Sequence, residues 1–455
     1  MENSGPSSVP LLRPKPSSQP GRPQAFLVAM VLSLGISVHI GFNIAAPNSF
    51  DKDLVIDLQL HKSMWEVLSM AFPAGGLLGH LVTASGRSET SDIRIDFNIA
   101  LLLFFTASAI SALNETWFWF AFGRFIAGFA AGMSVVIAPL YISKWPLVEF
   151  QHFLHSTHQV SIAAGMALAY ALSLSLVSTS KFAWQKVYLC SGCCSVFAFA
   201  CLIVAQASNI LSRQTYGSYV SFINLDQSKT SPNTQASNSA HATRNRIFVL
   251  DKSMLVSSVL LFSVHFSGVE GLFYYSTFVF RQSGFSNASL ISFCLGLIHV
   301  ASTLLSISTS QSRHRLYLLN GAHFVMAICL AAIPWALASR HWIAICLASI
   351  AIVASDVGPA STIWFIVADI TKNQVHGFIV LIGVALHWIA TWIIVAIIPL
   401  MYSVAGPYLF IFFAIVAFAS ALFSLQVLSP MLYQYESSVS DMPQSSDSEA
   451  GTSSN

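Results

Sequence analysis

Apolar runs of about 20 residues recur along almost the whole chain, and they limit the possible folds more than any other feature. A helix needs about 20 mostly apolar residues to cross the hydrocarbon core of a bilayer. Of the 455 residues, 55% are hydrophobic and 9% are charged, whereas a soluble protein has about 25% charged residues. The runs are continuous rather than alternating, which favours helices over a membrane barrel. We therefore predict an all-α protein embedded in a lipid bilayer.

The apolar runs form two sets of six, separated by one long polar connection. They predict twelve membrane spans, at residues 25–47, 63–84, 97–113, 117–142, 151–176, 184–208, 252–280, 288–310, 316–337, 341–369, 376–402 and 405–431. The corresponding regions are a disordered cytosolic tail at 1–24, a bundle at 25–208, a cytosolic loop at 209–251, a bundle at 252–431 and a disordered cytosolic tail at 432–455.

The basic residues indicate the orientation of the chain. If both termini lie in the cytosol, 14 of the 21 Lys and Arg residues fall in cytosolic segments. Cytosolic loops of membrane proteins carry such an excess, so we expect both termini inside the cell. The net charge of +2 gives no support to a nucleic-acid partner.

Short segments recur at equivalent places in the two halves. "SVHIGFN" at 37–43 is matched by "SVHFSGVE" at 263–270, and "STHQ" at 156–159 by "ALHW" at 385–388. A third match pairs "SGRS" at 85–88 with "SRHR" at 312–315. Together the three matches predict a duplicated six-helix unit. Transporters built from internal repeats bind their substrate near the bilayer midplane, between the repeats.

Eight segments in order resemble the sugar porters of the major facilitator superfamily, and among them the facilitative hexose transporters of animals. They include "GFNIAAPNS" (41–49), "GRFIAGFAAGMSVVIAPLYIS" (123–143), "SGVEGLFYYS" (267–276) and "GPASTIWFIVADI" (358–370). The resemblance implies twelve helices in two pseudo-symmetric six-helix bundles. It also implies passive transport of glucose or fructose across the plasma membrane by alternating access, without catalysis or a cofactor.

The resemblance also implies a substrate site between the bundles. Gln159 and Trp364 keep the family's residues, whereas His265, Glu270 and His299 stand where the family has amides. Gln, Asn, His, Trp and Tyr suit sugar hydroxyls and ring faces without carrying a permanent charge. The predicted sugar-binding residues are Gln159, His265, Glu270, Tyr274, His299, Trp364, His387 and Trp388.

Glu270 is an acid inside an apolar run. A charged carboxylate at the bilayer centre costs about 2.5–3.5 kcal/mol on insertion scales, so it should face a wet cavity or a partner. On one continuous helix, Ser267, Glu270, Gly271 and Tyr274 would form a single polar stripe. We expect Glu270 to line the central cavity with His299 as its partner; the alternative is a buried structural group.

The inner gate departs from the family pattern. The resemblance places gate residues at Arg87, Lys144, Arg315 and Asp369, but Lys144 stands where the family has glutamate. Two alternative functions follow. The weakened gate suits a sugar sensor that does not transport, and Glu270 suits a proton-coupled carrier of sugar or another small solute.

The remaining polar residues in the spans have structural interpretations. Cys190, Cys193 and Cys194 have no histidine or acid at ligand spacing, so we predict no metal site. We interpret His39 and Asp356 as groups that hydrogen-bond between packed helices. Oligomeric state is left open.

Glycines inside the apolar runs predict close helix packing, because small residues let membrane helices approach each other. These are Gly75, Gly76, Gly79, Gly123, Gly128, Gly132 and Gly165.

Overall fold

The computed structural model describes residues 27, 31, 33–85, 92–143, 148–176, 182–207, 252–309, 314–370 and 373–431. Within these ranges all the elements of regular structure are helices, as predicted. The two tails, the loop 209–251, Arg87 and Lys144 lie outside the described residues.

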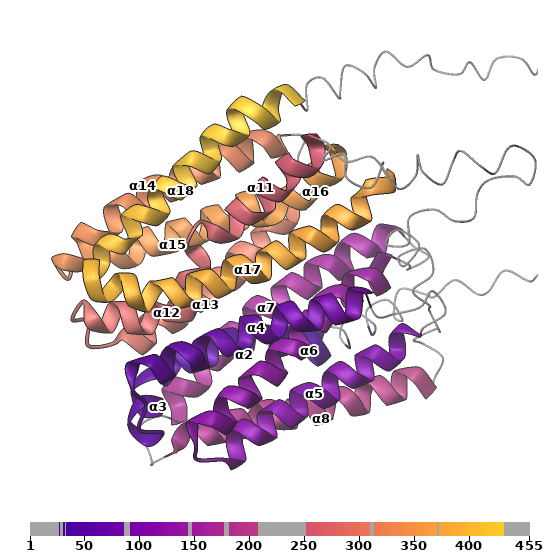
Figure 1. Ribbon diagram of the computed structural model, residues 1–455, viewed down its shortest axis with the longest axis vertical. Helices are drawn as coiled ribbons and strands as arrows, with labels where there is room; N and C mark the ends of the chain where they lie inside the picture. Colours follow the sequence, from indigo (N-terminus) through magenta and orange to yellow (C-terminus); the bar gives the residue numbers. More distant parts are fainter. Residues whose placement is uncertain are drawn as a thin grey trace, which may run out of the picture.

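The first half of the chain forms one bundle of helices (Figure 1). Its elements are η1 (Ser33–Ser37), α2 (Val38–Ser49), α3 (Asp51–Asp57), α4 (Lys62–Ser85), α5 (Ile93–Leu113), α6 (Trp117–Ser143), α7 (Val148–Leu176) and α8 (Ala183–Ala207). From the second span on, their bounds follow the predicted spans to within a few residues. The short connecting helix α3 was not predicted.

The second half forms the other bundle, drawn in orange and yellow beside the indigo and magenta first half (Figure 1). Its elements are α11 (Lys252–Phe266), α12 (Val269–Gln282), α13 (Ala288–Thr309), α14 (Arg315–Ala338), α15 (Ile343–Ser355), η2 (Asp356–Ala360), α16 (Ser361–Ile370), α17 (Asn373–Ala405), η3 (Gly406–Tyr408), α18 (Leu409–Phe423) and η4 (Ser424–Leu428).

Two predicted spans are interrupted. The break in 252–280 corrects the prediction of one continuous helix, and the irregular turn in 341–369 lies where a kink was expected beside Asp356. Residues 252–280 break at Gly268, whose φ of +87° is left-handed, so α11 ends before it and α12 begins after it. Residues 341–369 pass through the π-helical turn η2, which contains Pro359. Proline lacks the N–H that a regular helix needs, so kinks and irregular turns gather there.

Ten helical stretches of the described residues are long and apolar enough to cross a membrane. The last of them, Leu381–Met431, contains both α17 and α18. The ten stretches therefore correspond to eleven of the twelve predicted spans. The first predicted span, 25–47, is described continuously only from Ser33.

Glycines allow α4 and α6 to pack with their backbones in contact. A Cβ atom on Gly128 would lie 1.9 Å from the carbonyl oxygen of Phe72, and one on Gly132 would lie 2.0 Å from that of Gly76. Neither position leaves room for a side chain. This confirms the packing role predicted for these glycines.

We predict that Gly128→Ala destabilises the protein by about 1–3 kcal/mol, because the added methyl forces two backbones apart. Gly321→Ala on α14 is the matched control, since a Cβ there would meet nothing within 4 Å. Thermal unfolding of the purified protein in detergent measures both. Equal Tm values for the two variants would contradict the close packing of α4 and α6.

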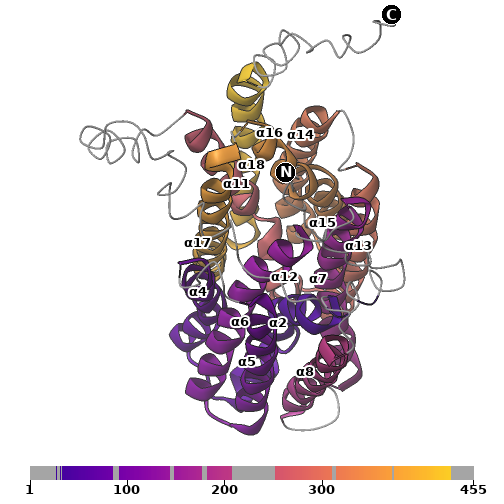
Figure 2. The ribbon, with the colours of Figure 1, turned by 90° about the vertical axis from the view of Figure 1, so that its right-hand side faces the viewer.

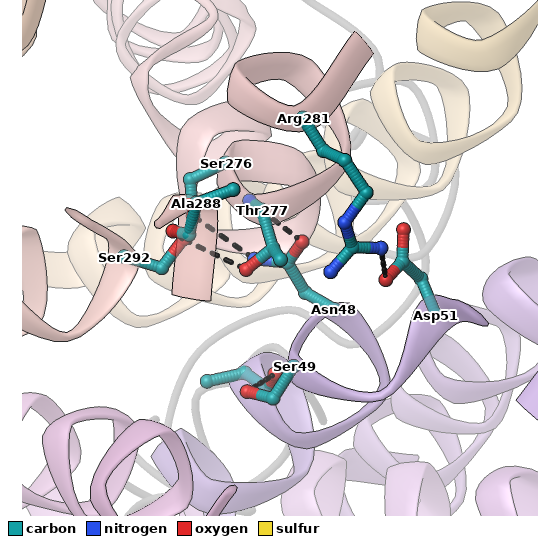
Figure 3. A network of polar contacts seen from close by, with 9 residues as sticks. Asn48, Ser49, Asp51, Ser276, Thr277, Arg281, Ala288 and Ser292 are labelled. Atoms are coloured by element: carbon teal, nitrogen blue, oxygen red, sulfur yellow. Dashed lines mark hydrogen bonds and ion pairs between the residues drawn. The ribbon is translucent and has the colours of Figure 1, made fainter. Parts of the chain in front are cut away.

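The two bundles are joined tightly at the end where α2 stops, which we call the Asp51 end (Figures 1 and 2). Asn48 reaches across to α12: its amide oxygen accepts the backbone N–H of Thr277 at 3.1 Å, and its NH₂ donates to Ser276 at 3.0 Å (Figure 3). The Tyr170 hydroxyl on α7 donates to the carbonyl of Phe273 at 2.7 Å. These contacts connect the two halves through buried groups.

An ion pair completes the connection at this end. Arg281 on α12 contacts the carboxylate of Asp51 on α3 (Figure 3). Burial raises the pKa of the Asp51 carboxyl, and the Arg281 guanidinium opposes that rise. The side chains keep only 22% and 10% of their surface exposed, so solvent screens the pair less than it would a surface pair.

We predict that Asp51 and Arg281 stabilise the folded protein as a pair. In a double-mutant cycle of Asp51→Ala, Arg281→Ala and the double variant, the coupling energy should be at least about 1 kcal/mol, because each single variant leaves one partly buried charge without its partner. Thermal unfolding measures the stability of each variant. Arg340→Ala is the control, because Arg340 is exposed. Additive single effects would show that the contact does not hold the halves together.

Candidate functional site

A cavity of about 270 Å³ lies between the two bundles. This volume is close to the lower end of the range of about 300–1,000 Å³ found for small-molecule sites. The eight residues predicted to bind substrate all lie along it: Gln159, His265, Glu270, Tyr274, His299, Trp364, His387 and Trp388. They come from α7, α11, α12, α13, α16 and α17, so neither bundle could form the cavity alone.

The cavity extends from the middle of the protein toward the end opposite Asp51. Its lining continues to Ser306 near the end of α13 and to Ser361 and Trp364 on α16. Toward the Asp51 end it stops at Phe273 and Tyr274, which are buried together with Tyr170 and Phe50 in one cluster of apolar side chains. Asn48 contacts this cluster directly, because its NH₂ group lies 3.3 Å from both the Tyr170 hydroxyl and the carbonyl of Phe273.

Glu270 is the centre of a polar cluster in the cavity wall. Its Oε1 atom lies 2.7 Å from Nδ1 of His265 and 3.4 Å from Nδ1 of His387. Its Oε2 atom accepts a hydrogen bond of 2.6 Å from the Thr391 hydroxyl. The rings of His265 and His387 are themselves in contact, with centroids 4.0 Å apart. Glu270 therefore lines the cavity with partners on both α11 and α17.

The partner of Glu270 was predicted wrongly. His299 does not contact it; Nδ1 of His299 lies 2.8 Å from the carboxylate of Asp356, which Ser302 also contacts. Asp356 starts the irregular turn η2, so this group links α13 to the kinked part of the tenth span. The structure thus confirms the inter-helix hydrogen bond expected of Asp356, and it pairs the two groups that sequence analysis had treated separately.

The break at Gly268 explains why His265 and Glu270 meet. On a continuous helix, residues five apart point about 140° away from each other. The left-handed turn at Gly268 separates α11 from α12, so Glu270 turns back toward the last turn of α11. A Cβ at Gly268 would lie 2.3 Å from Phe413, so both the backbone angle and the space available there require glycine.

Thr391 and His158 also line the cavity, and sequence analysis did not include them in the site. Thr391 replaces an asparagine of the resembled family, which was a usable signal for its position. His158 precedes Gln159 in the chain, but its neighbour in the fold, Ser37, is 121 residues away. No spacing in the sequence indicates such a contact.

The predicted gate residues are only partly described. The guanidinium of Arg315 lies over the ring of Phe365, 4.9 Å from its centroid. Arg87, Lys144 and the side chain of Asp369 lie outside the described part of the structure. The gate assignment therefore stays a prediction.

Two further interpretations concern packing. His39 is buried and contacts Ser195 at 2.6 Å and the carbonyl of Ser191 at 3.1 Å, which confirms its role between α2 and α8. Cys190, Cys193 and Cys194 are free and exposed. In the described residues, the group of His, Cys, Asp and Glu side chains close enough to share a metal ion is His265, Glu270 and His387.

The cavity can hold a small polar molecule by contacts that are easily reversed. Carboxylate, imidazole and amide groups supply hydrogen-bond donors and acceptors. Trp364 and Trp388 supply flat apolar faces beside them. This combination fits a ligand with hydroxyls around a ring whose C–H faces are apolar.

The chain is similar to known sugar transporters. The chicken solute carrier family 2, facilitated glucose transporter member 2, is 19% identical over 409 residues, which cover 83% of this chain and 76% of the relative. The mouse member 8 is 24% identical over 338 residues, covering 70% and 68%. A crystal structure of a D-xylose-proton symporter superposes with a TM-score of 0.73 at 18% identity, over 88% of this chain and 97% of the other.

The superposition confirms the predicted fold of twelve helices in two six-helix bundles. The family model of the sugar (and other) transporters matches residues 27–429, nearly the whole helical part of the chain. That family consists of carriers rather than enzymes, and the apolar helices place the protein across a membrane. The chain therefore belongs to the sugar transporter family, as an integral multi-pass membrane protein.

Proposed function

We propose that this protein carries a hexose, glucose or fructose, passively across the plasma membrane by alternating access. The observation that supports this most directly is the cavity between the bundles, lined by all eight residues expected to contact a sugar. The curated relatives are named as facilitated glucose transporters, which favours passive transport of a hexose.

The sugar binds among groups from both bundles. Gln159 approaches it from the first bundle, and Glu270, His299 and His387 from the second. Each of these groups exchanges hydrogen bonds with water when the sugar leaves, so binding stays moderate, as transport requires. Trp364 and Trp388 pack against the apolar faces of the ring.

The arrangement of the two ends suits one state of an alternating-access cycle. The Asp51 end is joined by Asn48 and Arg281, whereas the cavity extends toward the opposite end. If both termini are cytosolic, this state exchanges sugar with the cytosol. Opening the Asp51 end requires the ion pair and the Asn48 contacts to separate.

We predict that the protein restores uptake of radiolabelled glucose or fructose in a host that lacks hexose transporters. Gln159→Ala and Glu270→Gln should each reduce uptake at least tenfold, because the first removes an amide from the cavity and the second removes the negative charge beside two imidazoles. Gln282→Ala and Glu115→Gln are the matched controls, since both side chains are exposed outside the cavity.

Uptake of both sugars equal to that of the empty vector would contradict the proposal. Sugar that stabilises the purified protein against heat without any uptake would instead support the alternative of a sensor that does not transport. Surface expression of every variant has to be measured beside uptake.

A second candidate, proton-coupled transport, is favoured by the contacts of Glu270. This carboxylate lies beside two imidazoles in the cavity wall, and such groups exchange protons readily. One similar structure is titled a D-xylose-proton symporter.

The two transport modes give different responses to a pH gradient. Proton coupling predicts that an inward proton gradient drives sugar accumulation above equilibrium, and that Glu270→Gln equilibrates sugar without accumulating it. Passive transport predicts equilibration in both proteins, with or without a protonophore. Reconstituted vesicles with an imposed gradient separate the two.

A further inference from the structure

We propose that His265, Glu270 and His387 form a binding site for a divalent transition-metal ion of the Zn²⁺ class inside the central cavity. Each residue offers one ligand atom, and these atoms all lie within 4.8 Å of one another. All three residues line the cavity, so an ion can reach them by the same route as a solute. The sequence-based prediction of no metal considered only the cysteines, and His387 lies far from His265 and Glu270 in the chain.

The distances in this cluster are near those of a metal site. A tetrahedral ion with ligands at about 2.0–2.1 Å holds neighbouring ligand atoms about 3.3 Å apart. Oε1 of Glu270 lies 3.4 Å from Nδ1 of His387 and 2.7 Å from Nδ1 of His265. The first distance fits without change, and the second requires the His265 ring to move by about half an ångström.

One imidazole nitrogen of the cluster makes no hydrogen bond. Nδ1 of His387 is buried, and the carboxylate of Glu270 lies 3.4 Å away, too far for a short hydrogen bond. The two imidazole rings are in contact, 4.0 Å between centroids, and Nδ1 of each ring lies within 3.4 Å of the same Oε1 atom. A cation between the rings and Oε1 would be a ligand partner for Nδ1 of His387.

Thr391 orients the carboxylate for this role. Its hydroxyl donates to Oε2 of Glu270 at 2.6 Å, which leaves Oε1 facing both imidazoles. Hydrogen bonds of this kind to a ligating carboxylate fix its orientation and raise metal affinity. The cluster therefore has a supporting contact in addition to its three ligands.

The ligand types select the class of ion. Two imidazole nitrogens and one carboxylate oxygen suit Zn²⁺, Cu²⁺ or Ni²⁺, whereas Ca²⁺ and Mg²⁺ prefer sites made of oxygen. Three protein ligands leave a fourth position for water or a solute hydroxyl. An ion held there would occupy the space between residues that we assign to sugar, so it would compete with sugar. Competition with sugar depends on the proposed transport function, whereas binding of the ion does not.

Calorimetric titration of ZnCl₂ into the purified full-length protein, without a polyhistidine tag, tests the site. We expect one saturable site, and an affinity at least tenfold lower in His265→Ala and in His387→Ala. His299→Ala is the matched control, because this cavity histidine is paired with Asp356 instead. It should bind Zn²⁺ as the unmodified protein does. Affinity unchanged in both His265→Ala and His387→Ala would overturn the proposal.

A spectroscopic measurement on the unmodified protein does not depend on how the variants fold. Co²⁺ bound here should give the intense visible bands of a tetrahedral site with nitrogen and oxygen ligands, and ZnCl₂ should remove them. The absence of such bands, or a thiolate charge-transfer band from the cysteines, would overturn the proposal. If the unmodified protein binds Co²⁺ but takes up no sugar, only the proposed transport function is contradicted.

Discussion

A carboxylate placed in a hydrocarbon solvent needs polar partners or water, and this requirement organises the centre of the protein. Glu270 obtains a hydroxyl from Thr391 and an imidazole from His265, with a second imidazole nearby. These partners come from α11 and α17, and Glu270 itself lies on α12, so the carboxylate determines how these three helices approach one another. The cavity wall and the candidate ligand site result from that one requirement.

The contacts between the bundles differ at the two ends of the molecule. At the Asp51 end, backbone carbonyls, hydroxyls and an ion pair connect α2 and α3 to α12 (Figure 3). Toward the other end, polar residues line a cavity instead. Within the first bundle, glycines keep neighbouring helices in backbone contact. That bundle can move as a rigid body, because the packing inside it leaves no room for adjustment.

Much of the site was predictable from the sequence, but its pairing was not. The eight residues along the cavity were found because they match the family's motifs or carry polar groups in apolar runs. His299 was preferred over His265 as the partner of Glu270 because a helical stripe assumes a continuous helix, and Gly268 interrupts it. The contact of His299 with Asp356 spans 57 residues, a separation at which no sequence period applies.

The sequence by itself determined that the chain is helical, crosses a membrane repeatedly and consists of two similar halves. Those properties depend on local hydrophobicity, which each stretch of about 20 residues carries on its own. The tertiary structure alone decided which polar groups pair within the cavity and which end of the molecule is joined. Those properties depend on how helices from both halves approach one another, and a backbone turn at one glycine is enough to change which side chains meet.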